Sequence, residues 1–170
     1  MRLTHYLFQF LLFLLFCFLQ SILFVRNLPI YRFLPDIAFI IFLFCSINNR
    51  QLVGAISGFI AGIIIHIFML PDSTLGVYSF VYVFIGYFAG MLKGKLIVDN
   101  LFLPLLYFTI AFIIEKILLF FFSLLPEISI ASSSIISILI EYGVSLLFVP
   151  LVYNLLRLFK LINLNQRKSQ

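Results

Sequence analysis

The stretch Gly-Ala-Ile-Ser-Gly-Phe-Ile-Ala-Gly at residues 54–62 and the stretch Gly-Tyr-Phe-Ala-Gly at residues 86–90 carry a glycine at every fourth position. Residues four apart lie on the same face of an α-helix. In lipid, a face made of small residues lets two helix backbones approach closely enough to be held by dispersion. The spacing therefore predicts two membrane helices that pack against each other through glycine.

The turn between these stretches sets an expected register. Folded as an antiparallel hairpin about Asp72, the chain brings Gly58 level with Gly86 and Gly54 level with Gly90, because the members of each pair are equidistant from the turn. A helical hairpin with two glycine pairs at its centre is the resulting prediction.

The composition places the whole chain in a membrane. Of 170 residues, 64% are hydrophobic and 10% are charged, and the mean hydropathy is +1.24. Soluble domains contain about 45–50% apolar and about 25% charged residues. The sequence predicts an all-α polytopic membrane protein with one domain, residues 1–162, and a short polar cytoplasmic tail, residues 163–170. The six expected transmembrane helices cover about 6–25, 34–47, 52–70, 75–92, 96–125 and 130–156.

The distribution of basic residues predicts the orientation in the bacterial inner membrane. With six spans and a cytoplasmic N-terminus, the outer loops hold only Arg26 and Arg32, so the positive-inside rule places both termini in the cytoplasm. The cytoplasmic segments hold Arg2, Arg50, Lys93, Lys95, Arg157, Lys160, Arg167 and Lys168. These cations form no basic stripe with aromatic platforms, which argues against nucleic acid as a partner.

Charged residues inside the last two spans predict an ion pair. Lys116 lies ten residues before Pro126 and Glu141 lies ten residues after Ala131, so an antiparallel hairpin places them at similar depth. Charged groups in a membrane span are costly and require partners. We expect an intramembrane Lys116–Glu141 ion pair, or a hydrogen-bonded proton shared by the two side chains, that locks the hairpin. A proton relay is the less favoured alternative, because only Glu115 is near and a relay needs several acids in series.

Other polar residues suggest local contacts. Asp36 follows Pro35 at the start of the second span, where a carboxylate caps the free N–H groups of a helix. His66 is expected opposite Ser79 in the hairpin, as a hydrogen-bonded packing residue. In the first span, a polar stripe on or near one helical face is a candidate surface for another helix; it comprises Gln9, Cys17, Gln20 and Ser21.

No constellation for catalysis is present in the sequence. With only His5 and His66, and without an HExxH, GxSxG, P-loop or Rossmann pattern, the sequence predicts no enzyme activity, no metal site and no cofactor.

At the motif level, the chain resembles the bacterial rod shape-determining MreD family. The resemblance is carried by Leu-Pro-Asp at 34–36, Gly-Phe-Ile-Ala-Gly at 58–62, Leu75-Gly76 and Gly86-Tyr87, together with chain length, six-span hydropathy and a basic tail. The family usually carries an acidic residue at the position of His66 in this chain. The expected helix-packing or partner-interface residues are Pro35, Asp36, Gly54, Gly58, Phe59, Gly62, His66, Gly76, Gly86 and Gly90.

The resemblance implies a non-enzymatic inner-membrane scaffold of the cell-elongation machinery. Its implied partners are the single-span protein MreC and, in the wider complex, MreB filaments and peptidoglycan synthases. Membrane lipids are the remaining expected partner, at the basic cytoplasmic loops.

The alternative is the substrate-capturing subunit of an energy-coupling-factor vitamin transporter, whose fold the MreD fold is thought to resemble. Such subunits commonly dock through an AxxxA-like patch in the first helix, whereas no alanine precedes Ala38 here. They also need a pocket with convergent polar groups, and the outer loops of this chain are short and sparsely polar.

Overall fold

A computed structural model describes residues 11, 14, 15, 18, 36–69, 76–92, 102–125 and 134–158 of the chain. This part of the chain is all-helical, as the sequence predicted, and five helices are assigned in it. They are α2 (Ile37–Asn48), α3 (Gln51–Met69), α4 (Val77–Met91), α5 (Phe102–Ser123) and α6 (Ile135–Leu158). In the first expected span, the four described residues Leu11, Leu14, Leu15 and Phe18 are all helical.

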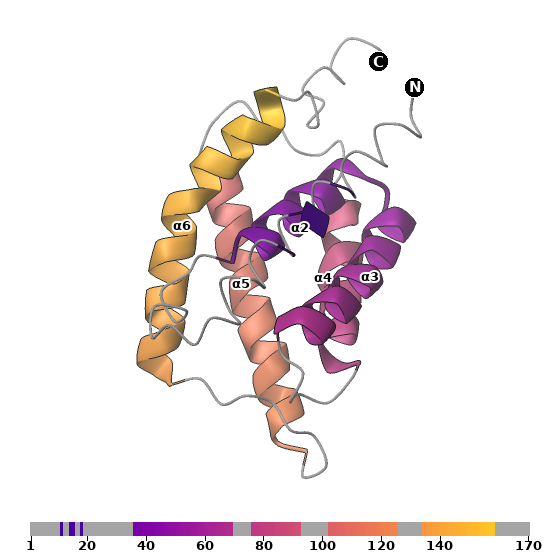
Figure 1. The fold of residues 1–170 in the computed structure, drawn as a ribbon, viewed down its shortest axis with the longest axis vertical. Helices are drawn as coiled ribbons and strands as arrows, with labels where there is room; N and C mark the ends of the chain where they lie inside the picture. The colour runs from indigo at the N-terminus through magenta and orange to yellow at the C-terminus, as the bar shows by residue number, and fades with distance from the viewer. Residues whose placement is uncertain are drawn as a thin grey trace.

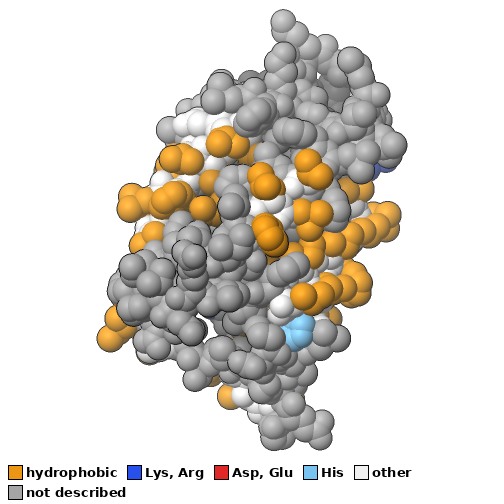
Figure 2. All heavy atoms as spheres, in the orientation of Figure 1, with side chains coloured by type: hydrophobic (Ala, Val, Ile, Leu, Met, Phe, Trp, Pro, Cys, Tyr) orange, Lys and Arg blue, Asp and Glu red, His pale blue; other side chains and the backbone are white. Residues whose placement is uncertain are grey.

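Two of these helices are long and apolar enough to cross a membrane. They are Phe102–Ser123 and Ile135–Leu156, and the remaining three are shorter apolar helices. The chain is therefore consistent with a membrane location. Figure 2 shows hydrophobic side chains spread across the described part of one face.

The shortest helix, α2, forms the centre of the described fold. Figure 1 shows it between the α3–α4 pair and the α5–α6 pair, and it contacts all four of these helices. At about 1.5 Å per residue, its 12 residues extend about 18 Å, well short of a hydrocarbon core of about 30 Å. The described helix is therefore shorter than a full membrane span, and the span predicted at about 34–47 stays a prediction.

The sequence of α2 explains its position. A helix that is apolar on every side needs neighbours on every side. Its buried residues follow one another without a polar face, and they are Ala38, Phe39, Ile40, Ile41, Phe42, Leu43, Phe44 and Ser46. Aromatic rings of α2 pack against rings of three other helices. The ring centre of Phe39 lies 5.5 Å from that of Tyr82 in α4 and 6.1 Å from that of Phe108 in α5. The ring centre of Phe44 lies 5.8 Å from that of Tyr153 in α6.

Among the described helices, α3 and α4 form the most extensive contact, as an antiparallel hairpin. Figure 1 shows the two helices side by side, and α4 begins after Gly76. Gly76 has a φ of 99°, a left-handed conformation that side chains disfavour, and a Cβ built on it meets no atom within 4 Å. The structure therefore explains this glycine by backbone conformation at the helix start and not by close packing.

Candidate functional site

Glycine residues bring the backbones of α3 and α4 into direct contact. A Cβ atom added to Gly54 would overlap the Gly86 carbonyl, and one added to Gly58 would overlap the Tyr82 carbonyl. The same addition at Gly62 would overlap the backbone of Ser79. These glycines, spaced four residues apart on α3 and α4, form a glycine ladder. At its other end, a Cβ added to Gly90 would lie 2.7 Å from Gln51 Cα. The interface is thus closed by backbone atoms, which cannot move aside as flexible side chains can.

The register of this hairpin differs from the predicted one. Gly54 faces Gly86 instead of Gly90, and Gly58 faces Tyr82 instead of Gly86. A ladder with a period of four residues matches itself after a shift of one helical turn. Spacing alone therefore fixes the faces that meet but not the register, and the assumption of a symmetrical turn about Asp72 was wrong.

The shifted register also changes the surroundings of His66. Ser79 lies against Gly62, one helical turn before His66, so the predicted Ser79–His66 pairing is wrong. His66 itself is buried, which agrees with a packing residue. The Ser79 hydroxyl is buried without a hydrogen-bond partner among the described residues.

The outer side of α3 carries an apolar stripe that α4 does not cover. Its exposed members are Leu52, Ile56, Phe59 and Ile67. Because the spacings between these residues are three, four and eight positions, they share one face of the helix, opposite the glycine ladder. Phe59, one of the predicted interface residues, is therefore available to a lipid or to another helix.

Asp36 caps the central helix, as expected from its place after Pro35. Its Oδ1 atom accepts a hydrogen bond of 2.9 Å from the Phe39 N–H, and its own N–H donates to Ser145 Oγ of α6 at 3.0 Å. The cap therefore also ties α2 to α6. The sequence offers one signal for the second contact, since Ser145 lies one helical turn after Glu141 on α6.

The capping geometry makes a testable prediction. We expect Asp36→Ala to lower the free energy of unfolding by about 1 kcal/mol, within the usual range of about 0.5–2 kcal/mol for loss of an N-cap. Asp36→Asn preserves an acceptor of similar capping strength and is the matched control. Thermal unfolding in detergent measures both. An equal loss in the two variants would contradict capping and assign the effect to charge.

Helices α5 and α6 hold a polar cluster in otherwise apolar surroundings. Lys116 Nζ donates a hydrogen bond of 2.9 Å to Glu141 Oε1, so the structure brings together the two residues that the sequence paired. The same ammonium lies 4.7 Å from the centre of the Phe112 ring and 3.7 Å from Glu115 Oε2. A second polar contact joins the helices, because the Thr109 and Tyr142 hydroxyls lie 3.0 Å apart.

Glu115 is the least satisfied member of this cluster. Only 3% of the residue is exposed, and its Oε2 atom has no hydrogen-bond partner within the described part of the chain. Asp36 at the start of α2 and Tyr78 of α4 are within electrostatic range of it. The cluster is therefore surrounded by four different helices, a feature that sequence spacing did not reveal.

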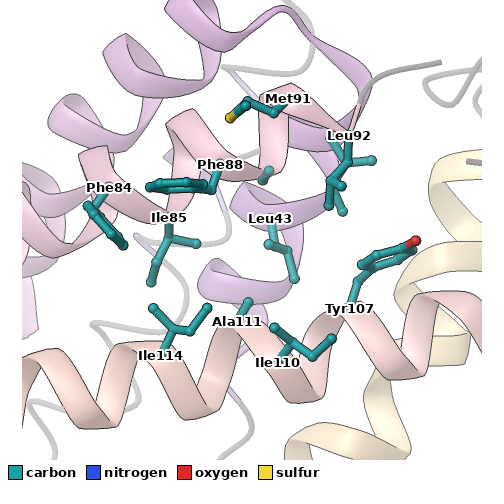
Figure 3. A pocket seen from close by; sticks show the side chains of 12 residues that line it. Leu43, Phe84, Ile85, Phe88, Met91, Leu92, Tyr107, Ile110, Ala111 and Ile114 are labelled. Atoms are coloured by element: carbon teal, nitrogen blue, oxygen red, sulfur yellow. The ribbon is translucent and has the colours of Figure 1, made fainter. Parts of the chain in front are cut away.

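An apolar groove separates parts of α4 and α5. It has a volume of about 340 Å³, and Leu43 and Ile47 of α2 also line it. Among its described lining residues, only Tyr107 carries a hydroxyl group. Figure 3 shows the α4 and α5 side chains facing each other across it. Small-molecule sites normally combine an apolar lining with several convergent polar groups, so this groove does not favour capture of a vitamin.

The chemistry of the described residues is that of packing and charge pairing. No group of three or more His, Cys, Asp or Glu side chains suitable for a metal ion occurs among them. The predicted residues Gln9, Cys17, Gln20, Ser21 and Pro35 lie outside the described part of the chain, so their expected contacts stay predictions.

Comparison with known proteins gives one positive result. A family model described as "rod shape-determining protein MreD" matches residues 1–159. No curated protein and no solved structure matches the chain. The expected likeness to the energy-coupling-factor subunit fold therefore stays a prediction.

Proposed function

The chain belongs to the MreD family of rod shape-determining proteins, and from this premise we propose that it is a non-enzymatic scaffold for partner membrane helices. Membership of the family connects the protein with the determination of rod shape in bacteria. In the proposed role, the protein binds and positions other components of the cell-elongation machinery. Its energetics are those of helix packing in lipid.

The proposed partner is the single-span protein MreC, and through it MreB filaments and the peptidoglycan synthases. The proposed topology has six spans in the inner membrane with both termini in the cytoplasm, supported by the excess of Lys and Arg in the cytoplasmic segments. In this orientation, the basic loops face the filaments or anionic lipid headgroups.

The observation that carries the proposal is the glycine-closed hairpin of α3 and α4, packed on the buried helix α2. Backbone contacts at Gly54 and Gly58 leave little room for the two helices to shift. A surface that is already rigid loses less conformational entropy when a partner binds. The outer apolar stripe of α3, defined above, is therefore the proposed docking surface for a partner helix.

Substitution of Phe59 tests this surface. Phe59 is 52% exposed, so its replacement by alanine leaves the core intact while it removes a large contact from the stripe. We expect Phe59→Ala to reduce the amount of MreC that co-purifies with the full-length protein by about tenfold, equivalent to about 1.4 kcal/mol.

The matched control is Ile113→Ala on α5, where the replaced side chain is 50% exposed. It should leave MreC co-purification unchanged, because Ile113 lies on another helix. Equal recovery of MreC with Phe59→Ala and the wild-type protein would contradict docking on α3. Failure of the wild-type protein to retain MreC would contradict the proposed partner.

A further inference from the structure

The polar cluster of α5 and α6 contains more acids than bases. Glu115, Lys116 and Glu141 supply two carboxyl groups and one ammonium. Ionisation of all three leaves one uncompensated negative charge in an apolar interior. A group in that position is neutralised in preference to remaining buried as an unpaired ion.

Both carboxyl groups lie within ion-pair distance of Lys116, but only that of Glu141 accepts a hydrogen bond from it. Lys116 is 2.9 Å from Glu141, a hydrogen-bonded ion pair, and 3.7 Å from Glu115, which is beyond hydrogen-bond reach. An ionised carboxylate is an acceptor on both oxygens and needs donors around it. Glu115 Oε2 has none among the described residues.

Among the residues that the structure describes, the groups that face Glu115 from the neighbouring helices do not compensate its charge. From α2, Asp36 is occupied as the helix cap and adds negative charge; from α4, Tyr78 presents a neutral phenol. From α6, Glu141 adds a second carboxylate, and within α5 itself Lys116 is engaged with Glu141.

We propose that Glu115 is a buried proton-binding site, and that its proton decides which carboxylate Lys116 pairs with. In the observed arrangement, Glu115 is the neutral acid and Lys116 binds Glu141. Transfer of the proton to Glu141 breaks the O–H bond on Glu115 and forms one on Glu141. Lys116 keeps its three hydrogens and turns to Glu115, so the net charge of the cluster does not change.

The two carboxyl groups differ in their access to protons. The side chain of Glu115 is 4% exposed, whereas that of Glu141 is 26% exposed. Protons therefore reach the cluster through Glu141, and Glu115 binds the proton inside the protein. Because the ion pair with Glu141 joins α5 to α6 while a pair with Glu115 stays within α5, the position of one proton controls a contact between two helices.

Infrared spectroscopy of the full-length protein in lipid nanodiscs tests this assignment. The chain has only six Asp and Glu side chains, so the carbonyl stretch of a protonated carboxylic acid can be assigned by substitution. We expect this signal at neutral pH in the wild-type protein and its loss in Glu115→Gln, which preserves shape. The matched control Glu127→Gln should retain the signal.

Glu141→Gln tests the sharing of the ammonium. Lys116 then has Glu115 as its remaining partner, so Glu115 should ionise and the signal should disappear. A signal retained in Glu141→Gln would overturn the exchange. Absence of the signal from the wild-type protein, or its persistence in Glu115→Gln, would overturn the proton site. These two spectra decide the proton site even when Glu141→Gln fails to fold.

Discussion

Gly58→Leu is expected to destroy the packing of α3 against α4 and to abolish co-purification of MreC. A Cβ at this position overlaps the Tyr82 carbonyl, and the adjacent Val83 nitrogen is 2.9 Å away. Both neighbours are helix backbone, so the helices must separate. Overpacking of a core usually costs about 1–3 kcal/mol, and overlap with the backbone of α4 places this variant at or above the upper end. Unfolding in detergent measures the loss.

Gly143→Leu is the matched control for this prediction. Gly143 is also a helical glycine, but a Cβ built on it meets no atom within 4 Å. Removing a glycine from a helix interior gains up to about 1 kcal/mol in propensity, so this variant should be at least as stable as the wild-type protein. Wild-type stability in Gly58→Leu would show that the two helices are not held together by backbone contact at Gly58.

Lys116→Leu is expected to have the second-largest effect. It removes the only cation of the α5–α6 cluster among the described residues and leaves the Glu141 carboxylate without its hydrogen-bonded ion-pair partner. Breaking a buried ion pair costs about 3–5 kcal/mol. Since the two side chains of the pair are 23% and 26% exposed, we expect about 2–3 kcal/mol, measured as the free energy of unfolding in detergent.

A double-mutant cycle separates the ion pair from simple loss of side-chain volume. In Lys116→Leu with Glu141→Leu, both charges are gone and the apolar surface is preserved, so at least half of the single-variant loss should return. If the double variant is as unstable as the sum of the two single variants, the two residues do not interact energetically. The lock between α5 and α6 then rests on packing and on the Thr109–Tyr142 contact alone.

Much of the site could be predicted because its signals are local in the sequence. The apolar composition fixed the helical class, and the period of four glycines identified the faces of α3 and α4 that meet. The pairing of Lys116 with Glu141 could be predicted because both residues are equally far from the turn between their helices. Charged residues in lipid also have few other partners. The helix cap at Asp36 follows from residue type and position.

Other features depend on contacts that no local pattern records. The one-turn shift of the hairpin escaped prediction because a repeating ladder is compatible with several registers, and backbone fit selects among them. The central place of α2 was not predicted because hydropathy identifies an apolar run but not the helices that pack around it. The sequence showed that Glu115 is near Lys116, but not that Oε2 is left without a donor.

By itself, the sequence of this protein determined the helical class, the small and apolar faces of α3 and the pairing of Lys116 with Glu141. These properties arise from side-chain chemistry repeated at the helical period. Only the tertiary structure decided the register of α3 against α4 and the burial of α2 among its neighbours. It also decided that Lys116 lies 2.9 Å from Glu141 but 3.7 Å from Glu115. The reason is physical: such choices depend on distances between atoms far apart in the chain, which exist only once the helices have packed.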